Sequence, residues 1–374
     1  MHGRGSSCDL PNRFETVHLD VLPDGGGSDD LIHEFTEIEG EQRRITTQVY
    51  RDHSRSILNP VNSPDLGFRW TINPYRGCEH GCSYCYARPT HEMLGLSCGL
   101  DFETKIFAKT DAVRILLREL ARPSWQAESI MLSGVTDAYQ PIERHMGITR
   151  DILELLCACR QPVSIVTKSA LILRDLDLLR EMAHARTVRV AVSLTTLDAA
   201  LSAQMEPRAA SPAQRLRTIR ELSQAGVPVV VMAAPIIPGL TDRELPALLK
   251  AGKEHGAVGA GYILLRLPWQ LKELFLDWLS RTQHPDRAKH VESLIRQSRG
   301  GKLYDSTLGK RHVGDGPFAQ QIRDTFDVFS RQYGLSPARS DSQPTGARLD
   351  SSGFRPPNPD GEYGQMQLFG MVNP

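Results

Sequence analysis

From about residue 68 to about residue 267, the chain alternates between short apolar runs and longer stretches with apolar positions at helical spacing. The short runs are apolar throughout, which is typical of strands covered on both faces. In one longer stretch, Val113, Leu116, Leu117 and Leu120 share a helical face after a potential capping residue, Asp111. The pattern predicts strands at 68–73, 102–107, 129–133, 163–167, 188–194, 227–234 and 261–267. It predicts helices at 111–120, 148–159, 174–183, 211–225 and 242–255.

Strands that alternate with helices predict a parallel sheet with the helices outside it. We expect an α/β fold of about six β-α units, which suits a partial barrel or a doubly wound sheet. The first strand is not followed by a Gly-x-Gly-x-x-Gly motif, which disfavours a Rossmann fold that binds dinucleotides. Two more helices are predicted after the alternating region, at 285–298 and 317–333.

The ends of the chain differ in composition from this alternating region. Residues 1–60 are polar with few apolar runs, and we expect a loosely ordered arm there. Residues 61–300 are expected to form the core domain, and residues 301–335 a helical extension. Residues 336–374 are rich in Ser, Pro, Gly, Asp and Arg, a composition that predicts a disordered tail.

Charge and composition narrow the classes of function. The chain has 44 Lys and Arg against 44 Asp and Glu, a formal net charge of +0, so binding to nucleic acid would need a local patch. No stretch reaches the ~18 apolar residues that a membrane span requires, and no apolar signal region is found near the N-terminus. We therefore expect a cytoplasmic protein without membrane contact. Seven cysteines in such a chain favour cluster or metal chemistry over disulfides.

Three of the seven cysteines lie in one short segment with C-x3-C-x2-C spacing: Cys78, Cys82 and Cys85. Three thiolates can hold three corners of an iron–sulfur cluster, and Gly77 and Gly81 allow the backbone to wrap around it. The next cysteine along the chain, Cys98, lies well beyond the segment. One iron would then stay open to a ligand that is not protein, as in catalytic metal sites. The alternative is a zinc site that uses Cys98 or His80 as its fourth ligand.

The cysteine segment resembles the radical S-adenosylmethionine (SAM) superfamily, whose C-x3-C-x2-C motif has an aromatic residue, here Tyr84, before the third cysteine. The fuller form, Cys-x3-Cys-x-Tyr-Cys-Tyr, includes Tyr86 and resembles the spore photoproduct lyase branch, with its relatives described as DNA-repair photolyase-like. The resemblance extends over about residues 68–300. Three more segments are similar to that branch: 136–143, 206–208 and 235–242.

This resemblance implies a partial (β/α)6, TIM-like barrel that holds a 4Fe–4S cluster through the three cysteines of the segment. SAM would bind the open iron, and its reductive cleavage would give methionine and a 5′-deoxyadenosyl radical that abstracts hydrogen from the substrate. A flavodoxin or ferredoxin would donate the electron. A nucleic-acid substrate is expected only by analogy, and a small molecule or a protein is the alternative. A zinc-stabilised binding module without redox chemistry is the alternative from another class.

The resemblance also assigns contacts with SAM to residues near the carboxyl ends of strands, where barrel enzymes bind their ligands. Tyr84 is expected near the adenine. Thr136 or Asp137 would replace a Gly-Gly-Glu-like segment that binds the amino group of SAM. Lys168 matches a lysine that reaches the carboxylate of SAM in the lyase branch, and Ser193 is expected at the ribose.

One feature of the lyase branch is missing. Spore photoproduct lyases use an additional cysteine as a hydrogen donor near the end of the strand after the cluster loop, and residues 129–137 contain none. Repair of thymine dimers is therefore not expected. Tyr84 and Tyr86 match tyrosines of the branch, and a radical-relay role is predicted for them. Arg208 and Arg266 are further candidates for binding a carboxylate or a charged substrate.

The remaining cysteines and the tail carry two smaller predictions. Cys98, Cys157 and Cys159 are expected to pack in the core. The segment 365–369 resembles the pentapeptide by which bacterial DNA-processing proteins dock to the sliding clamp, with Gln365, Leu368 and Phe369 as anchors. The simpler alternative is that Leu368 and Phe369 pack against the barrel of this chain.

Overall fold

The computed structural model describes residues 4–6, 9–10, 12–13, 30–39, 43–337 and 349–359. The pentapeptide at 365–369 lies outside this part of the chain, so docking to a sliding clamp stays a prediction. Within the described residues, no helix has the length and apolar character needed to cross a membrane.

A large sheet of eight strands, in the order β12-β11-β10-β9-β8-β7-β4-β3, forms the centre of the molecule. Its strands are β3 (Asn59–Pro60), β4 (Trp70–Ile72), β7 (Ile130–Leu132), β8 (Val163–Thr167), β9 (Val188–Ser193), β10 (Val229–Ile236), β11 (Gly259–Leu264) and β12 (Ser336–Pro337). From β4 to β11 the neighbours are parallel and follow one another in chain order. A doubly wound sheet would reverse its strand order at a switch point, so this order is that of a barrel wall.

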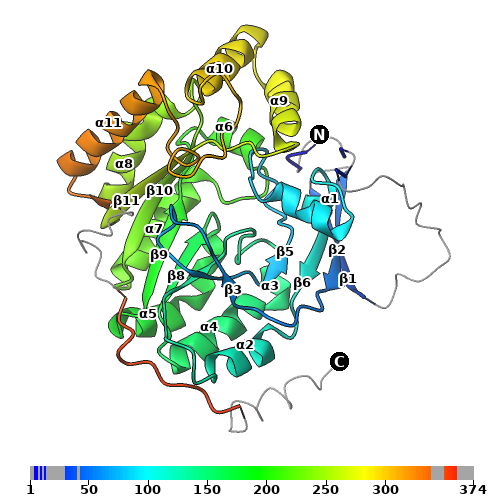
Figure 1. Ribbon diagram of the computed structural model, residues 1–374, viewed down its shortest axis with the longest axis vertical. Helices are drawn as coiled ribbons and strands as arrows, with labels where there is room; N and C mark the ends of the chain where they lie inside the picture. The colour runs from blue at the N-terminus through cyan, green and yellow to red at the C-terminus, as the bar shows by residue number, and fades with distance from the viewer. Residues whose placement is uncertain are drawn as a thin grey trace, which may run out of the picture.

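Helices join successive strands and cover the outer face of this sheet, with α4 beside α5, α7 beside α8 and α8 beside α11 (Figure 1). The helices are α1 (Asp101–Thr104), α2 (Ala112–Leu120), α3 (Glu143–Met146), α4 (Ile148–Ala158), α5 (Leu176–His184), α6 (Ala199–Met205), α7 (Pro212–Gln224), α8 (Leu245–Glu254), α9 (Leu271–Thr282), α10 (Pro285–Gln297) and α11 (Pro317–Gln332). Short 3-10 helices are η1 (Arg88–Leu94), η2 (Ala170–Asp175) and η3 (Asp242–Glu244).

Local sequence explains where several of these elements begin and end. Helix α7 starts with the predicted Ser211-Pro212 pair, and Ser211 forms a capping box with Gln214. Gly226 follows this helix with a φ of 82°, a left-handed conformation that favours glycine. Asp111 precedes α2 as predicted, but its side chain does not cap the helix, because it pairs with Arg114 instead.

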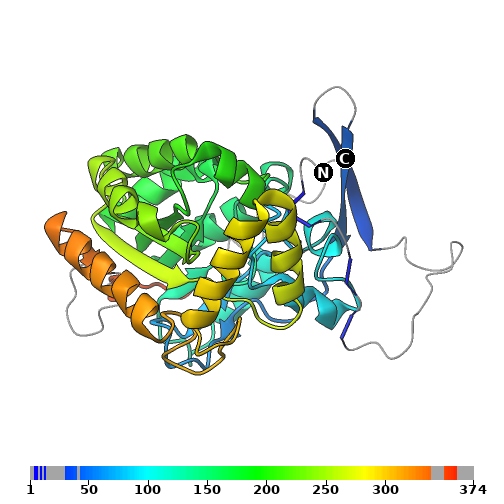
Figure 2. The same ribbon diagram turned by 90° about the horizontal axis from the view of Figure 1, so that it is seen from above.

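A second, four-stranded sheet in the order β1-β2-β6-β5 stands beside the large sheet. It consists of β1 (Leu31–Glu39), β2 (Arg43–Arg51), β5 (Tyr75–Arg76) and β6 (Lys105–Ala108). Figure 2 shows the β1–β2 hairpin extending away from the body. These two strands lie within residues 1–60, for which the sequence predicts a loosely ordered arm. The prediction of a strand at 102–107 is wrong for its first half, because residues 101–104 form α1 and the strand begins at Lys105.

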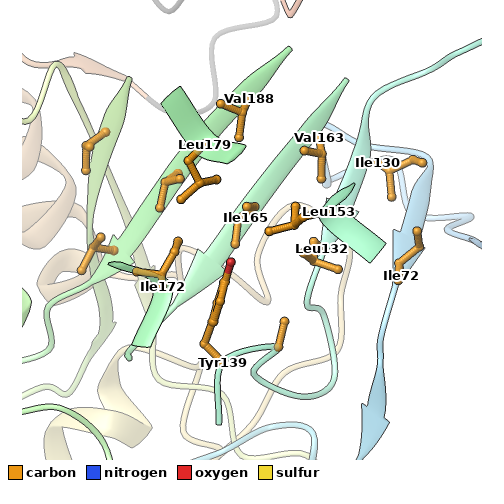
Figure 3. Close-up of a cluster of buried hydrophobic side chains, with 14 of the residues drawn as sticks. Ile72, Ile130, Leu132, Tyr139, Leu153, Val163, Ile165, Ile172, Leu179 and Val188 are labelled. Atoms are coloured by element: carbon orange, nitrogen blue, oxygen red, sulfur yellow. The ribbon is translucent and has the colours of Figure 1, made fainter. Parts of the chain in front are cut away.

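The main hydrophobic core lies between the large sheet and its helices. Figure 3 shows Leu132, Val163 and Ile165 of the sheet meeting Leu153 of α4 and Tyr139. Cys157 and Cys159 are buried in this same cluster, as expected of core residues. In a second cluster, α9 and α10 pack against the cysteine segment through Leu271, Trp278, Val291 and others. Helices α9 and α10 therefore close over one side of that segment.

Residues 349–359 run back along the outside of the barrel. Asp350 donates its backbone N–H to the carbonyl of Arg186 at 2.9 Å, and Arg355 donates to the carbonyl of Cys159 at 2.8 Å. This part of the predicted tail is thus bound to the loops that follow α4 and α5, while the predicted domain boundaries stay a prediction.

Candidate active site

The three cysteines lie in a loop, residues 77–86, which leaves β5 of the small sheet and ends at η1. The N–H of Cys78 donates to the carbonyl of Phe102 at 2.9 Å, which joins the loop to α1. Gly77 has a φ of 81° and Gly81 a φ of 66°. A Cβ on Gly77 would lie 2.9 Å from the carbonyl oxygen of Phe102, so both backbone conformation and space require glycine there.

The turn after β7 holds the cysteine loop from the side of the large sheet. The hydroxyl of Thr136 donates to the carbonyl of Gly77 at 2.6 Å, and the amide of Gln140 donates to the same oxygen at 3.3 Å. In return, the N–H of Glu79 donates to Oε1 of Gln140 at 2.8 Å. Thr136, a predicted contact of SAM, therefore binds the cysteine loop in this structure.

The carboxylate of Asp137, another predicted contact of SAM, accepts hydrogen bonds from neighbouring residues of the chain. The donors are the hydroxyl of Thr167 and the backbone N–H of Lys168, each at 2.8 Å. Nδ1 of His80 lies 3.4 Å from Oδ2 of the same carboxylate. Asp137 thus joins the ends of β7 and β8 to the cysteine loop.

Three of the predicted SAM contacts lie together at the carboxyl ends of β8 and β9. Nζ of Lys168 donates to Oγ of Ser193 at 2.8 Å and lies 5.8 Å from the centre of the Tyr84 ring. The hydroxyl of Tyr84 is 3.3 Å from that of Thr195. Burial lowers the pKa of Lys168, and the neighbouring Cys82 works against that effect. The structure therefore places the side chain of Lys168 beside the cysteine loop, with the hydroxyl of Ser193 and the ring of Tyr84 as its neighbours.

The cysteine thiols are themselves largely buried, with Cys78 and Cys82 each 7% exposed. Burial raises the pKa of Cys78 well above the ordinary range, and Asp137 and the two other cysteines add to the shift. Burial likewise raises the pKa of Cys82, followed by the charge of Glu206. Thiolates in this environment need a positive partner, and iron ions of a cluster supply one.

Unsatisfied polar atoms on the same loop also fit a missing group. Oγ of Ser83 and Oε2 of Glu79 are buried without a hydrogen-bond partner in the part of the chain that the structure describes. Within the same residues, no three His, Cys, Asp or Glu side chains converge closely enough to hold a single metal ion. Three soft donors in one glycine-containing loop suit an iron–sulfur cluster, which cysteine thiolates hold.

Sequence reasoning missed the group that holds the other side of the loop. Arg88 and Glu103 are both buried and form an ion pair at 2.5 Å. Arg88 also donates to the carbonyl of Cys82 at 2.9 Å. Glu103 accepts from the backbone N–H groups of Gly5 at 3.0 Å and Ser6 at 2.8 Å, so the N-terminal segment is bound to the loop. The spacing of apolar residues along the sequence does not reveal such a network of buried polar contacts.

The segment 206–208, one of those that carry the family resemblance, packs beneath the loop. Glu206 pairs with the buried Arg215 and accepts a hydrogen bond from Thr195 at 2.8 Å. Arg208 lies 3.3 Å from Oε1 of Glu79. Arg208, a candidate for binding a charged ligand, is therefore paired with the cysteine loop itself.

Tyr86 and Arg266 form the exposed edge of the site. Tyr86 is 43% exposed, and its hydroxyl donates to the carbonyl of Gly134 at the end of β7. The guanidinium carbon of Arg266 lies 5.0 Å from the centre of the Tyr86 ring. The loop residue after the third cysteine thus contacts both a neighbouring strand end and a cation.

Comparison of the sequence with protein families finds one model, described as the radical SAM superfamily, that matches residues 72–251. An uncharacterized protein of Mycobacterium tuberculosis is 40% identical over 246 residues, which cover 65% of this chain and 72% of that protein. An uncharacterized protein of Methanocaldococcus jannaschii is 30% identical over 197 residues, which cover 53% of this chain and 71% of that protein.

Among solved structures, the fold is similar to that of spore photoproduct lyase. One variant of that enzyme, with bound AdoMet and dinucleoside spore photoproduct, matches with a TM-score of 0.55 and 16% identity. The match covers 77% of this chain and 81% of the other. A second structure, the lyase complexed with dinucleoside spore photoproduct, gives the same TM-score. Together with the strand order, this likeness confirms the predicted partial barrel.

Proposed function

Because the chain belongs to the radical SAM superfamily, we propose that it binds a 4Fe–4S cluster through Cys78, Cys82 and Cys85 and uses it to cleave SAM reductively. The radical would then abstract hydrogen from a nucleic-acid substrate. The observation that carries the proposal is the position of the three thiols. In one loop, Cys78 and Cys82 are buried and Cys85 is partly buried, opposite the carboxyl edge of a parallel sheet, where barrel enzymes bind their ligands.

The residues near the loop have distinct roles in this proposal. The cluster, when bound, supplies the electron that breaks a carbon–sulfur bond of SAM. We propose that the ammonium group of Lys168 pairs with the carboxylate of SAM. The hydrogen bond from Lys168 to Ser193 at 2.8 Å supports this role, because it holds the ammonium group beside the cysteine loop. Asp137 fixes the backbone of Lys168 and so sets the direction of its side chain.

Apolar residues keep water away from the same place. Cys82 and Tyr84 belong to the hydrophobic cluster that includes Leu240, Leu265 and Met205. A radical at carbon reacts with whatever lies next to it, so exclusion of solvent protects the reaction. The C-terminal helices α9 and α10 complete this apolar wall.

The proposed substrate class rests on the likeness to the lyase, whose structures hold a dinucleoside spore photoproduct. Because identity to that enzyme is 16%, the likeness shows the fold alone. The segment 129–137 also lacks the hydrogen-donor cysteine. We therefore propose a nucleic acid as the substrate class, with a reaction other than repair of thymine dimers. A reduced flavodoxin or ferredoxin is the proposed electron donor.

Anaerobic reconstitution with iron and sulfide tests the proposal directly. The protein should turn brown, bind about four irons per chain and form 5′-deoxyadenosine from SAM when dithionite is added. Addition of single-stranded DNA, tRNA or ultraviolet-irradiated DNA should then show which nucleic acid raises the rate. A colourless protein with one tightly bound zinc ion would refute the enzymatic function. A brown protein that cleaves SAM, but whose rate no nucleic acid changes, would refute only the substrate class.

A further inference from the structure

Arg266 lies at the edge of the barrel where the site is built. It follows β11, and the backbone just before it still pairs with the neighbouring strand, because the N–H of Leu265 donates to the carbonyl of Ile236 at 2.9 Å. Lys168 and Ser193 occupy the same carboxyl edge, at the ends of β8 and β9. Arg266 is therefore held on a rigid element and not on a free loop.

The ring of Tyr86 fixes the orientation of the Arg266 side chain. The guanidinium carbon lies 5.0 Å from the ring centre, and the ring is itself anchored by the hydrogen bond from its hydroxyl to Gly134. A guanidinium that stacks on an aromatic ring keeps its N–H donors free, because they point outward in the plane of the group. Those donors form the fork that binds a carboxylate or phosphate through two hydrogen bonds.

The positive charge of Arg266 has no anionic partner among the residues that the structure describes. Nε of Arg266 is buried and has no hydrogen-bond acceptor there. The buried Arg88 and Arg215, by contrast, are each paired with a glutamate. A buried donor without an acceptor is unfavourable, and a bound anion would remove that penalty.

A second guanidinium supports the backbone next to Arg266. Arg299 is 2% exposed and donates to the carbonyls of Leu264 at 3.3 Å and Leu265 at 2.6 Å. Its acceptors are backbone carbonyls, which carry no full negative charge. Burial and then the charge of Arg266 lower the pKa of Arg299 to about 10, against smaller opposing effects of Tyr304 and Asp305. The two cations lie close enough to repel one another, and an anion at Arg266 would relieve that repulsion.

We propose that Arg266, stacked on Tyr86, binds an oxyanion of the substrate and so holds the substrate beside the cysteine loop. The shared chemistry is a phosphate or a carboxylate group. A phosphodiester is the form expected for the nucleic acid of the proposed function, on which this inference rests. Arg266 thereby becomes a specificity-determining residue that discriminates substrates by charge.

The test compares charged ligands with neutral analogues on the reconstituted holoenzyme. One pair is a thymidine oligonucleotide and its methylphosphonate counterpart, and the other is N-acetylglutamate and N-acetylglutamine. Affinities are measured anaerobically by calorimetry for the wild type, Arg266→Gln and Arg266→Lys. The matched control is Arg281→Gln, because Arg281 is a solvent-exposed arginine of α9 that pairs with Asp277 at 2.9 Å.

We expect the wild type to prefer the charged member of one pair by about tenfold or more, the effect of a charge-assisted hydrogen bond. The Gln variant should lose this preference, the Lys variant should keep part of it, and the control should keep all of it. A preference for the thymidine oligonucleotide over its methylphosphonate counterpart identifies a phosphodiester as the ligand. A preference for N-acetylglutamate over N-acetylglutamine identifies a carboxylate. Equal affinities within both pairs for the wild type, or an unchanged preference in Arg266→Gln, would overturn the proposal.

A second measurement separates this inference from the proposed function. Formation of 5′-deoxyadenosine from SAM and dithionite is measured without substrate for the wild type, Arg266→Gln and the surface control Arg281→Gln, and the control should keep the wild-type rate. If the rate of Arg266→Gln falls well below that of the control together with its charge preference, Arg266 binds SAM and the inference is wrong. If the wild type itself forms no 5′-deoxyadenosine, the proposed function fails, whereas the binding comparison still decides the role of Arg266.

Discussion

On the side that faces η1 and α1, the buried pair of Arg88 and Glu103 holds the cysteine loop and finds its partners within the protein. Glu103 accepts hydrogen bonds from Gly5, Ser6 and Arg88. On the side that faces the carboxyl edge of the sheet, Ser83 and Arg266 each have a buried polar atom without a partner in the described residues. The satisfied side holds the loop in place, and the unsatisfied side is available to ligands. Substitutions on the first side should therefore lower the stability of the protein, and those on the second side should weaken the binding of ligands.

The largest effect is expected at the cysteines. Replacement of Cys78, Cys82 and Cys85 by alanine removes every thiolate proposed to bind the cluster, so iron and colour should be lost completely after reconstitution. Cys98→Ala is the matched control, because Cys98 is also buried and packs in the same hydrophobic cluster as Cys82. It should bind iron like the wild type. Iron analysis together with visible absorbance measures the cluster in both variants. Loss of iron in Cys98→Ala as well would contradict a site with three cysteine ligands.

On the satisfied side, Glu103→Ala should lower the stability of the whole protein. The change leaves the buried Arg88 without its carboxylate and leaves Gly5 and Ser6 without an acceptor. Removal of one partner of a buried pair costs roughly 3–5 kcal/mol. Glu221→Ala should cost less than about 1 kcal/mol, because Glu221 pairs with Arg217 on the surface of α7. Urea unfolding of the two variants gives the difference, and equal losses would remove the structural role assigned to Glu103.

The sequence predicts the elements whose physics is local. The strand at 163–167 is found with the predicted bounds, because a short run of Val, Ile and Thr between helical segments has few alternatives. Helix α1 was missed because its four residues are too few to show a period. Helix α9 was also missed, although its apolar residues pack against the cysteine loop.

The sequence names the proposed ligands of the site, but it does not name the residues that support them. Spacing and resemblance point to the cysteines and to Lys168, which lie close together in the fold. Glu103 pairs with Arg88 and accepts a hydrogen bond from Gly5, and these residues lie apart in the sequence. A hydrophobic pattern indicates which positions are buried, but it does not indicate which polar residues meet. Contact of Thr136 or Asp137 with SAM stays a prediction. Their hydrogen bonds to the loop and to β8 could be seen only in three dimensions.

A pH effect of intermediate size is expected from His91 of η1, which lies on the same side of the loop as Arg88. His91 is buried, and burial lowers its pKa to about 4. The folded state therefore prefers the neutral ring, while the unfolded chain takes up a proton below about pH 6.5. Stability should fall as the pH decreases from about 6.5 toward 4, by roughly 2–3 kcal/mol from this residue.

Urea unfolding across this range should show a flatter profile for His91→Gln than for the wild type. The control is His184→Gln, since His184 is exposed at the end of α5 and its environment changes little on unfolding. A profile for His91→Gln as steep as that of the wild type would show that other groups cause the acid sensitivity.

The smallest effect is expected from Tyr86→Phe, on the unsatisfied side. The substitution removes only the hydrogen bond from the hydroxyl to Gly134, on a side chain that is 43% exposed. Stability should fall by about 0.5–1 kcal/mol, and the cluster should be unaffected. The ring that orients Arg266 remains, so the preference for charged ligands should persist in Tyr86→Phe and weaken in Tyr86→Ala. If Tyr86→Phe forms 5′-deoxyadenosine normally but yields no product from an accepted substrate, the hydroxyl takes part in the reaction itself. Tyr86 would then serve as the radical relay predicted from the sequence, and support of Arg266 would be only its second role.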